Sequence, residues 1–290
     1  MFIATLIAAP GGLEPSLTEN LRNAWGGGDI QWLSPDEAAE FTLAEVPGNL
    51  WDVWADLQAL HVDLAVQPQA GRRKAMLLAD MDSTMIAQEC IDELAEVAGA
   101  GAAVREITAR AMNGELDFEA ALLERMALLK GLPEAVIADV LSERITLAPG
   151  GAALVATMRS NGAHTALVSG GFTAFTGPVA AALGFDEDRA NVLLIEAGAL
   201  TGDVARPILG RQAKIDALEE ITARLGLSAA DVMAVGDGAN DLGMLGRAGA
   251  GVALHAKPSV AAKCDLRINH GDLTALLFLQ GYARSEFVQT

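Results

Sequence analysis

Cysteine and histidine are scarce in this sequence. Its 290 residues include only two cysteines, Cys90 and Cys264, and four histidines. Two isolated cysteines offer neither a disulfide framework nor the paired spacing of a zinc site, so we expect buried free thiols. No two histidines stand at metal-ligand spacing along the chain, which argues against a histidine-ligated metallohydrolase. Any metal is therefore expected on carboxylates.

Basic residues are also few, and long apolar runs are missing. Twenty lysines and arginines stand against 38 acidic residues, which gives a net charge of −18. This balance argues against a nucleic-acid partner, because such a partner requires a basic face. Apolar runs such as 76–79 and 232–235 are far shorter than the ~18 to 20 residues that span a bilayer, and no basic region precedes an apolar stretch at the start. We expect no membrane partner and a cytoplasmic globular protein.

Tryptophan is missing after residue 70, although residues 1–70 contain all four. The same segment has ten acidic residues and a single basic one, Arg22. Because composition changes at the polar stretch 67–74, we predict a small α+β domain over 1–70 and a second domain over 74–290. The order βαββαβ is typical of split-βαβ, ferredoxin-like domains and weakly resembles the amino-acid-binding ACT domains. The expected elements are strand 2–8, helix 13–25, strands 30–33 and 40–44, helix 50–60 and strand 62–66.

From residue 75 onward, short apolar runs are followed by polar, glycine-containing loops and then by helices. This order is typical of a parallel sheet covered on both faces, so we predict a Rossmann-like α/β core. Residues 87–141 are helical in pattern, which predicts a helical cap over the active site. A hairpin is expected at 191–195 and 200–204. The expected sheet strands are 75–79, 164–168, 232–235, 251–254 and 266–268.

Two carboxylates at positions i and i+2, Asp80 and Asp82, directly follow the first of these strands. In an extended segment their side chains point to the same side, at the carboxyl edge where open α/β sheets bind ligands. Crowded carboxylates repel each other, so the pair requires a cation or a shared proton. Taken alone, the pair also fits two solvated loop acids.

Groups suited to phosphate binding follow later elements. Ser169 and Gly170 come at the end of the second strand, where a hydroxyl and glycine amides can line an anion site. Lys214 opens a helix expected over 214–225, where the helix dipole slightly disfavours a cation, so a functional reason for this lysine is favoured. Taken alone, each pattern also fits an ordinary turn or a solvated lysine.

A tight glycine loop after the strand at 232–235 carries Asp237, Asn240 and Asp241. Such hard oxygen ligands suit Mg²⁺, which prefers a few carboxylates and completes its octahedron with water and substrate phosphate. The predicted cofactor is therefore Mg²⁺.

In their order and spacing, these four motifs resemble the haloacid dehalogenase superfamily, and within it the phosphoserine phosphatase branch, over about residues 74–278. The resemblance implies that Asp80 is the nucleophile and Asp82 the general acid/base. The implied phosphate contacts are Ser169, Gly170, Lys214 and Asn240, and the implied magnesium ligands are Asp80, the carbonyl of Asp82, and Asp237.

The same resemblance implies a set of residues in the cap that enclose a serine moiety. Here they are Glu89, Phe118 and Arg125, with Met112 packing the aliphatic part. Glu89 is expected to meet the substrate ammonium and Arg125 its carboxylate, a pairing for which the forked guanidinium is suited. The implied reaction is hydrolysis of O-phospho-L-serine to L-serine and phosphate, the last step of serine biosynthesis.

Two alternatives stay open. A phosphatase or phosphotransferase for another small phosphoester fits the same catalytic motifs. A serine-binding regulatory protein with a vestigial catalytic half fits the two-domain organisation, although the intact Asp80, Asp82, Lys214 and Asp237 argue against it. The sequence leaves open whether the first domain binds a ligand, and whether the chain forms a homodimer.

Overall fold

The computed structural model describes residues 1–112 and 115–289. By its internal contacts the chain divides into two compact units. Unit 1 combines residues 1–78, residues 149–165 and the chain from residue 218 onward. Unit 2 combines residues 79–148 and 166–217. Within the described residues, no helix is both long and apolar enough to cross a membrane.

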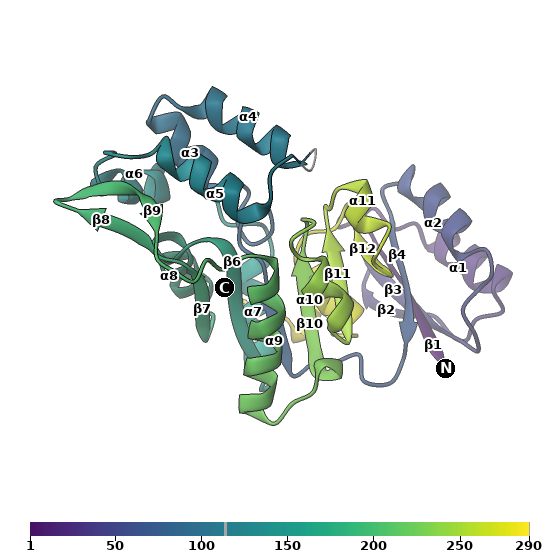
Figure 1. Ribbon diagram of the computed structural model, residues 1–290. Helices are drawn as coiled ribbons and strands as arrows, with labels where there is room; N and C mark the ends of the chain where they lie inside the picture. Colours follow the sequence, from purple (N-terminus) through teal and green to yellow (C-terminus); the bar gives the residue numbers. More distant parts are fainter. Residues whose placement is uncertain (113–114, 290) are drawn as a thin grey trace. The chain divides into compact units, whose positions relative to one another are not determined.

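Unit 1 begins with a four-stranded antiparallel sheet in the order β2-β3-β1-β4. Helices α1 and α2 lie together along this sheet (Figure 1). Apolar side chains from strands and helices, such as Leu6, Leu21, Phe41, Leu57 and Leu64, share one buried cluster. The predicted βαββαβ order is confirmed, with β1 at Phe2–Ile7, α1 at Pro15–Ala24, β2 at Gln31–Ser34, β3 at Ala38–Leu43, α2 at Leu50–Gln58 and β4 at Asp63–Pro68.

The later segments of unit 1 supply sheet strands in the order β12-β11-β10-β5. Strand β11 pairs in parallel with both β10 and β12. Their residues are almost all buried, as expected for strands covered on both faces. The elements are β5 (Met76–Ala79), α7 (Gly151–Ser160), β10 (Val232–Gly236), α10 (Leu242–Arg247), β11 (Ala250–Leu254), α11 (Pro258–Ala261), β12 (Leu266–Ile268) and α12 (Ala275–Leu279), with short 3₁₀ turns at Ala229–Asp231 and Arg284–Glu286.

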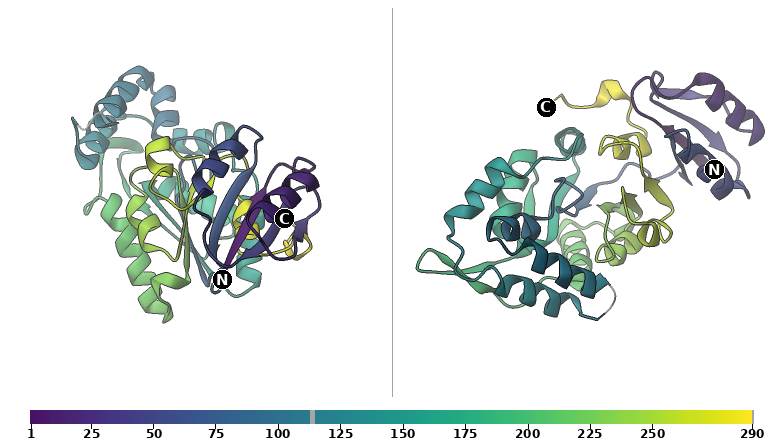
Figure 2. Two further views of the ribbon diagram at one scale, coloured as in Figure 1. Left: turned by 90° about the vertical axis from the view of Figure 1, so that its right-hand side faces the viewer. Right: turned by 90° about the horizontal axis from the view of Figure 1, so that it is seen from above.

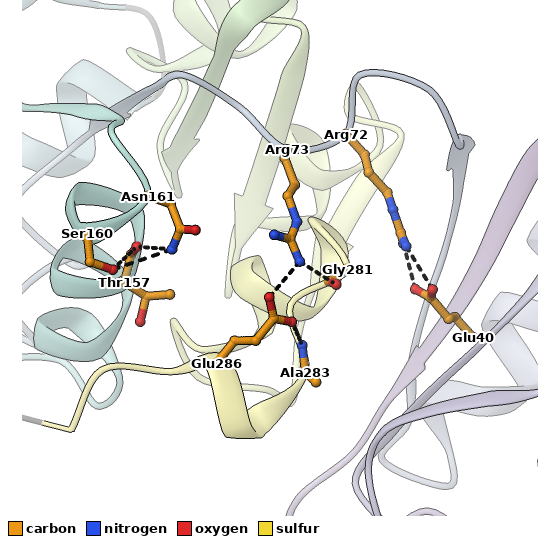
Figure 3. A network of polar contacts seen from close by, with 9 residues as sticks. All are labelled: Glu40, Arg72, Arg73, Thr157, Ser160, Asn161, Gly281, Ala283 and Glu286. Atoms are coloured by element: carbon orange, nitrogen blue, oxygen red, sulfur yellow. Dashed lines mark hydrogen bonds and ion pairs between the residues drawn. The ribbon is translucent and has the colours of Figure 1, made fainter.

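Buried acidic side chains join the first four-stranded sheet to later segments of unit 1. The carboxylate of Asp63 accepts hydrogen bonds from the backbone amides of residues 269–271. Glu40 receives two hydrogen bonds from Arg72, at 2.5 and 2.7 Å (Figure 3). Glu37 pairs with Arg284. Because each charge is matched by donors, the buried carboxylates remain satisfied.

Unit 2 contains the predicted helical stretch, together with a hairpin and part of the sheet. Helices α3 to α6 gather beside the hairpin β8–β9 (Figures 1 and 2), and β9 contacts α5. Strands β6 and β7 pair in parallel. The elements are α3 (Cys90–Val97), α4 (Gly101–Met112), α5 (Phe118–Ala127), α6 (Ala135–Glu143), β6 (His164–Phe172), α8 (Thr173–Leu183), β7 (Glu187–Asn191), β8 (Leu193–Glu196) and β9 (Ala199–Val204).

Three local expectations were wrong. Strand β6 continues to Phe172 instead of ending at 168, with an irregular register between Val168 and Phe172. Helix α9 (Arg211–Leu225) begins three residues before Lys214, so the lysine is its fourth residue. Asn191 was assigned to the hairpin but ends β7, a strand that the sequence did not predict because its run Glu-Asp-Arg-Ala-Asn is polar.

Candidate active site

The first pair of site residues is Asp80, which directly follows β5, and Lys214 on α9. The ammonium of Lys214 lies 2.5 Å from a carboxylate oxygen of Asp80. Both residues are nearly inaccessible, with 4% of Asp80 and 1% of Lys214 exposed. A buried charge needs a partner, and here each ion is the partner of the other. The predicted nucleophile and the predicted phosphate-binding lysine are thus in direct contact.

Asp82 is held at both carboxylate oxygens. One oxygen accepts a hydrogen bond from the backbone amide of Cys90 at 2.8 Å, and the other accepts one from the Ser169 hydroxyl at 3.1 Å. The amide of Gly171 in turn donates to the Ser169 hydroxyl oxygen at 2.8 Å. Cys90 is the first residue of α3, so the carboxylate lies where helix amides favour negative charge. These contacts fix the orientation of the predicted acid/base residue.

Both cysteines are buried free thiols, as expected. Burial raises the pKa of the Cys90 thiol far above its ordinary value, and the adjacent Asp82 carboxylate raises it further. A thiolate is the reactive form of cysteine, so Cys90 contributes its backbone amide to the site and not a nucleophile.

The loop after β10 is shaped around Asp241, which is fully buried. The backbone amide of Gly238 donates to its carboxylate at 2.9 Å. A Cβ atom at position 236 would lie 2.5 Å from the Asp241 carboxyl group, so only glycine fits there. A Cβ at position 238 would lie 2.2 Å from the side-chain oxygen of Asn240, which therefore folds back over the loop. The glycines allow this loop to carry several oxygen ligands in a small space.

Carboxylates that could hold a metal ion follow two strands: Asp80 comes directly after β5, and Asp237 and Asp241 lie on the glycine loop after β10. Such hard carboxylate oxygens suit Mg²⁺. Of these, Asp80 and Asp237 are the predicted ligands. Asp241 was recognised in the sequence as part of the same loop but was not assigned to the metal.

In the helical part of unit 2, Glu89 precedes α3 and accepts a hydrogen bond from the Ser83 hydroxyl at 2.8 Å. Ser83 has a left-handed backbone with φ of 56°, which is uncommon for a residue other than glycine. A serine of the first catalytic motif therefore positions one of the predicted substrate contacts. Ser83 is not among the predicted site residues, because a left-handed backbone conformation at a serine cannot be predicted from the motif.

Phe118 begins α5, where Asp117 caps the helix by accepting a hydrogen bond from the amide of Ala120. Its ring lies close to two glycines: added Cβ atoms at Gly170 and Gly210 would come within 3.0 and 2.9 Å of ring carbons. The predicted aromatic of the cap is therefore packed against Gly170, one of the predicted phosphate contacts. Met112 ends α4, but its side chain lies outside the described residues.

Arg125 lies on α5 and is mostly buried, and its Nε donates to the carbonyl of Ala121 at 3.2 Å. Burial lowers the pKa of its guanidinium, while the carboxylates of Asp92, Glu89 and Asp82 oppose that shift. An arginine nevertheless stays cationic. Burial also raises the pKa of Asp92, an effect that Arg125 opposes. The sequence does not indicate that Asp92 lies near Arg125, because Asp92 is typical of an acid in the first turn of a helix.

Residues 77–246 match the haloacid dehalogenase-like hydrolase family, over more than half of the chain. The chain belongs to this family. Among curated relatives, this hydrolase is 44% identical to a phosphoserine phosphatase of Haemophilus influenzae, over 79% of this chain and 71% of the relative. It is 43% identical to a phosphoserine phosphatase of Mycobacterium tuberculosis, over 78% of this chain. The matched region spans little more than half, 56%, of that longer relative.

Solved structures resemble this hydrolase over both its catalytic part and its whole length. A family hydrolase from Salmonella enterica serovar Typhi matches with a TM-score of 0.86 at 31% identity, covering 96% of this chain and 97% of that one. A phosphoserine phosphatase with bound substrate matches with a TM-score of 0.67 at 39% identity, covering 71% of this chain and 97% of that one. These likenesses support an α/β hydrolase core of this family.

Proposed function

We propose that this hydrolase is a phosphoserine phosphatase, which cleaves O-phospho-L-serine to L-serine and phosphate as the last step of serine biosynthesis. The observation that carries the proposal is the buried Asp80–Lys214 ion pair in the same unit as an Asp82 carboxylate held on both oxygens. The similarity to curated phosphoserine phosphatases supports the substrate. A cytoplasmic location is part of the proposal.

The proposed chemistry has two steps. In the first, the Asp80 carboxylate attacks phosphorus while the bond to the seryl oxygen breaks, and Asp82 gives that oxygen its proton. In the second, Asp82 takes a proton from water, whose oxygen attacks the same phosphorus and releases phosphate from Asp80. Lys214 neutralises charge on the phosphoryl oxygens, and the Ser169 hydroxyl with the Gly170 amide binds the transferring group.

Magnesium is the proposed cofactor. Asp80, the carbonyl of Asp82, and Asp237 would hold it through hard oxygen ligands. When bound, a divalent ion neutralises phosphate charge and orients the phosphoryl group. Asn240 is the further polar contact to the phosphate in this proposal.

The proposed serine contacts are Glu89 for the ammonium, Arg125 for the carboxylate and Phe118 for the apolar side. Glu89 and Arg125 are close enough to interact electrostatically, because the Glu89 carboxylate raises the pKa of Arg125. A zwitterionic amino acid carries both charges, so its ammonium would complement Glu89 and its carboxylate would complement Arg125. The resemblance also implies Met112, whose side chain lies outside the described residues.

Arg125→Ala should reduce use of phosphoserine about ten- to hundred-fold more than use of phosphoethanolamine, which has the ammonium but no carboxylate. The lost charge-assisted interaction is worth ~1.5 to 3 kcal/mol. The measurement is kcat/KM for both substrates. Arg110→Ala is the matched control, since Arg110 is half-exposed and pairs with Glu124. Equal losses on both substrates would show that Arg125 only supports the helices.

A substrate panel tests the proposed function directly. Phosphate release from L-phosphoserine, D-phosphoserine, phosphothreonine, phosphoethanolamine and glycerol phosphate is measured with Mg²⁺ and with EDTA. We expect L-phosphoserine to have the highest kcat/KM and activity to require Mg²⁺. A better substrate elsewhere in the panel would identify another small-phosphoester phosphatase, and binding of serine without any phosphate release would identify the regulatory alternative.

The first four-stranded sheet with α1 and α2 is proposed to be a regulatory, ACT-like domain that binds serine or forms a homodimer. All four tryptophans lie there, so their fluorescence reports on this part of the chain. Arg267 stacks on Trp51 at 3.8 Å, which couples that signal to β12. In an Arg125→Ala background, added serine should still change the emission. A flat titration up to saturating serine would show that this domain does not bind serine.

A further inference from the structure

Asn191 is a buried amide whose role lies outside the reaction steps given above. It ends β7, is 2% exposed and pairs in register with Phe172 of β6. Its Nδ2 donates to the carbonyl of Gly170 at 2.9 Å and to the carbonyl of Leu209 at 3.1 Å. Its Oδ1 accepts from the amide of Leu209 at 2.7 Å. Both donors and the acceptor of the side chain are therefore used on backbone groups.

The two segments that Asn191 joins are both parts of the site. Gly170 follows Ser169, whose hydroxyl holds Asp82. Leu209 lies two residues before α9, whose fourth residue is Lys214. The chain between Asn191 and Leu209 contains the hairpin β8–β9. The Asn191 side chain thus ties the segment before α9 to the Ser169–Gly170 stretch of β6.

The ring of Phe118 packs against both of these segments. Its ring lies against Gly170 on one segment and Gly210 on the other, where an added Cβ would come within 3.0 and 2.9 Å of ring carbons. A shift of either segment would open a gap or cause a collision at the ring, since well-packed groups do not slide freely. The amide of Asn191 is the polar link across the same two segments.

We infer that Asn191 is a positioning residue for phosphoryl transfer: its amide sets the register between the Ser169–Gly170 stretch of β6 and the segment that presents Lys214. This inference rests on the proposed function. Transferring a phosphoryl group depends mainly on placing charge and donors around it, and a displacement of about 1 Å can cost ~10²-fold in rate. Asn191 is not a catalytic residue, because it acts through backbone groups of Gly170 and Leu209.

Asn191→Asp is the first test, since it keeps the acceptor for the Leu209 amide and loses both donors. We expect kcat to fall about 10- to 100-fold, with KM for phosphoserine within threefold. Inhibition by orthovanadate, which adopts the five-coordinate geometry of a transferring phosphoryl group, should weaken by a similar factor. Product inhibition by L-serine should stay within twofold, because Glu89 and Arg125 lie on other elements.

Gln280→Glu is the matched control. Gln280 is also a fully buried amide, and it donates to the carbonyl of Leu276 and accepts from the amide of Lys74. Its substitution loses a donor at a comparable cost in thermal stability, but we expect kcat and vanadate inhibition within twofold of wild type. If Asn191→Asp does not fold, Asn191→Ser, which retains one donor, is measured in the same way.

Three results with the Asn191 variants would overturn the inference: unchanged kcat in a folded variant, a loss confined to KM, or vanadate inhibition that stays constant while kcat falls. A loss of kcat in Gln280→Glu equal to that in Asn191→Asp would also overturn it. The loss would then follow from changing any buried amide and not from the position of Asn191. If the wild type releases no phosphate from phosphoserine, the proposed function fails. The same comparison with p-nitrophenyl phosphate would still test Asn191.

Discussion

Asp80→Asn should abolish turnover of phosphoserine, with kcat reduced by roughly 10⁵-fold or more, as when the nucleophile of a covalent enzyme is removed. An amide is nearly the same size as a carboxylate but is a poor nucleophile toward phosphorus. It also loses the charge that pairs with the buried Lys214. The measurement is phosphate release over hours at high enzyme concentration, with thermal unfolding as a check on folding.

Asp82→Asn is the matched control, because it changes the neighbouring carboxylate in the same way. It should reduce kcat by at least ~10²-fold, since the amide cannot transfer the proton. The nucleophile remains in this variant, so slow turnover should persist. Activity of Asp80→Asn equal to that of Asp82→Asn would contradict a nucleophilic role for Asp80.

Lys214→Met should lower kcat by about 10²- to 10³-fold, the usual cost of removing one donor that stabilises developing charge. Methionine fills a similar volume, so the buried space is kept while the ammonium is lost. Asp80 then loses the ammonium that lies against its carboxylate. The measurement is kcat for phosphoserine at saturating Mg²⁺, which separates the lysine's role from metal binding.

Lys74→Met provides the comparison for Lys214. Lys74 donates from its ammonium to the carbonyl of Ala230, away from the motif residues. We expect Lys74→Met to keep kcat within twofold of wild type. A Lys214→Met enzyme with kcat within tenfold of wild type would show that the lysine serves the stability of Asp80 and not the reaction.

The motif residues could be predicted from the sequence because they stand at the ends of short apolar strands. Asp80 follows β5 and Asp237 follows β10, and β5 and β10 are neighbours in the sheet. The contacts between these motifs could not be predicted in the same way. Asn191 lies in a polar run without strand periodicity, and the Cys90 amide that holds Asp82 is a backbone group with no sequence signal.

The acidic composition of residues 1–70 suggests a domain boundary but does not predict which acidic side chains are buried. Sequence alone suggests ten solvated acids beside one arginine. Three of them, Glu37, Glu40 and Asp63, are buried and receive donors from residues 72, 269–271 and 284. Partners so far apart in the chain are not visible in a local pattern. The domain boundary near residue 70 therefore stays a prediction. Removal of residues 1–70 would break these contacts.

Trapping the covalent intermediate tests the central claim most directly. The enzyme is mixed with L-phosphoserine and Mg²⁺, quenched during turnover and treated with borohydride, which reduces an acyl phosphate to an alcohol. Peptide mass spectrometry should then find homoserine in place of aspartate at position 80, and no such change when phosphoserine is omitted. Phosphate release without any modification at Asp80, or with the modification at another carboxylate, would contradict this account.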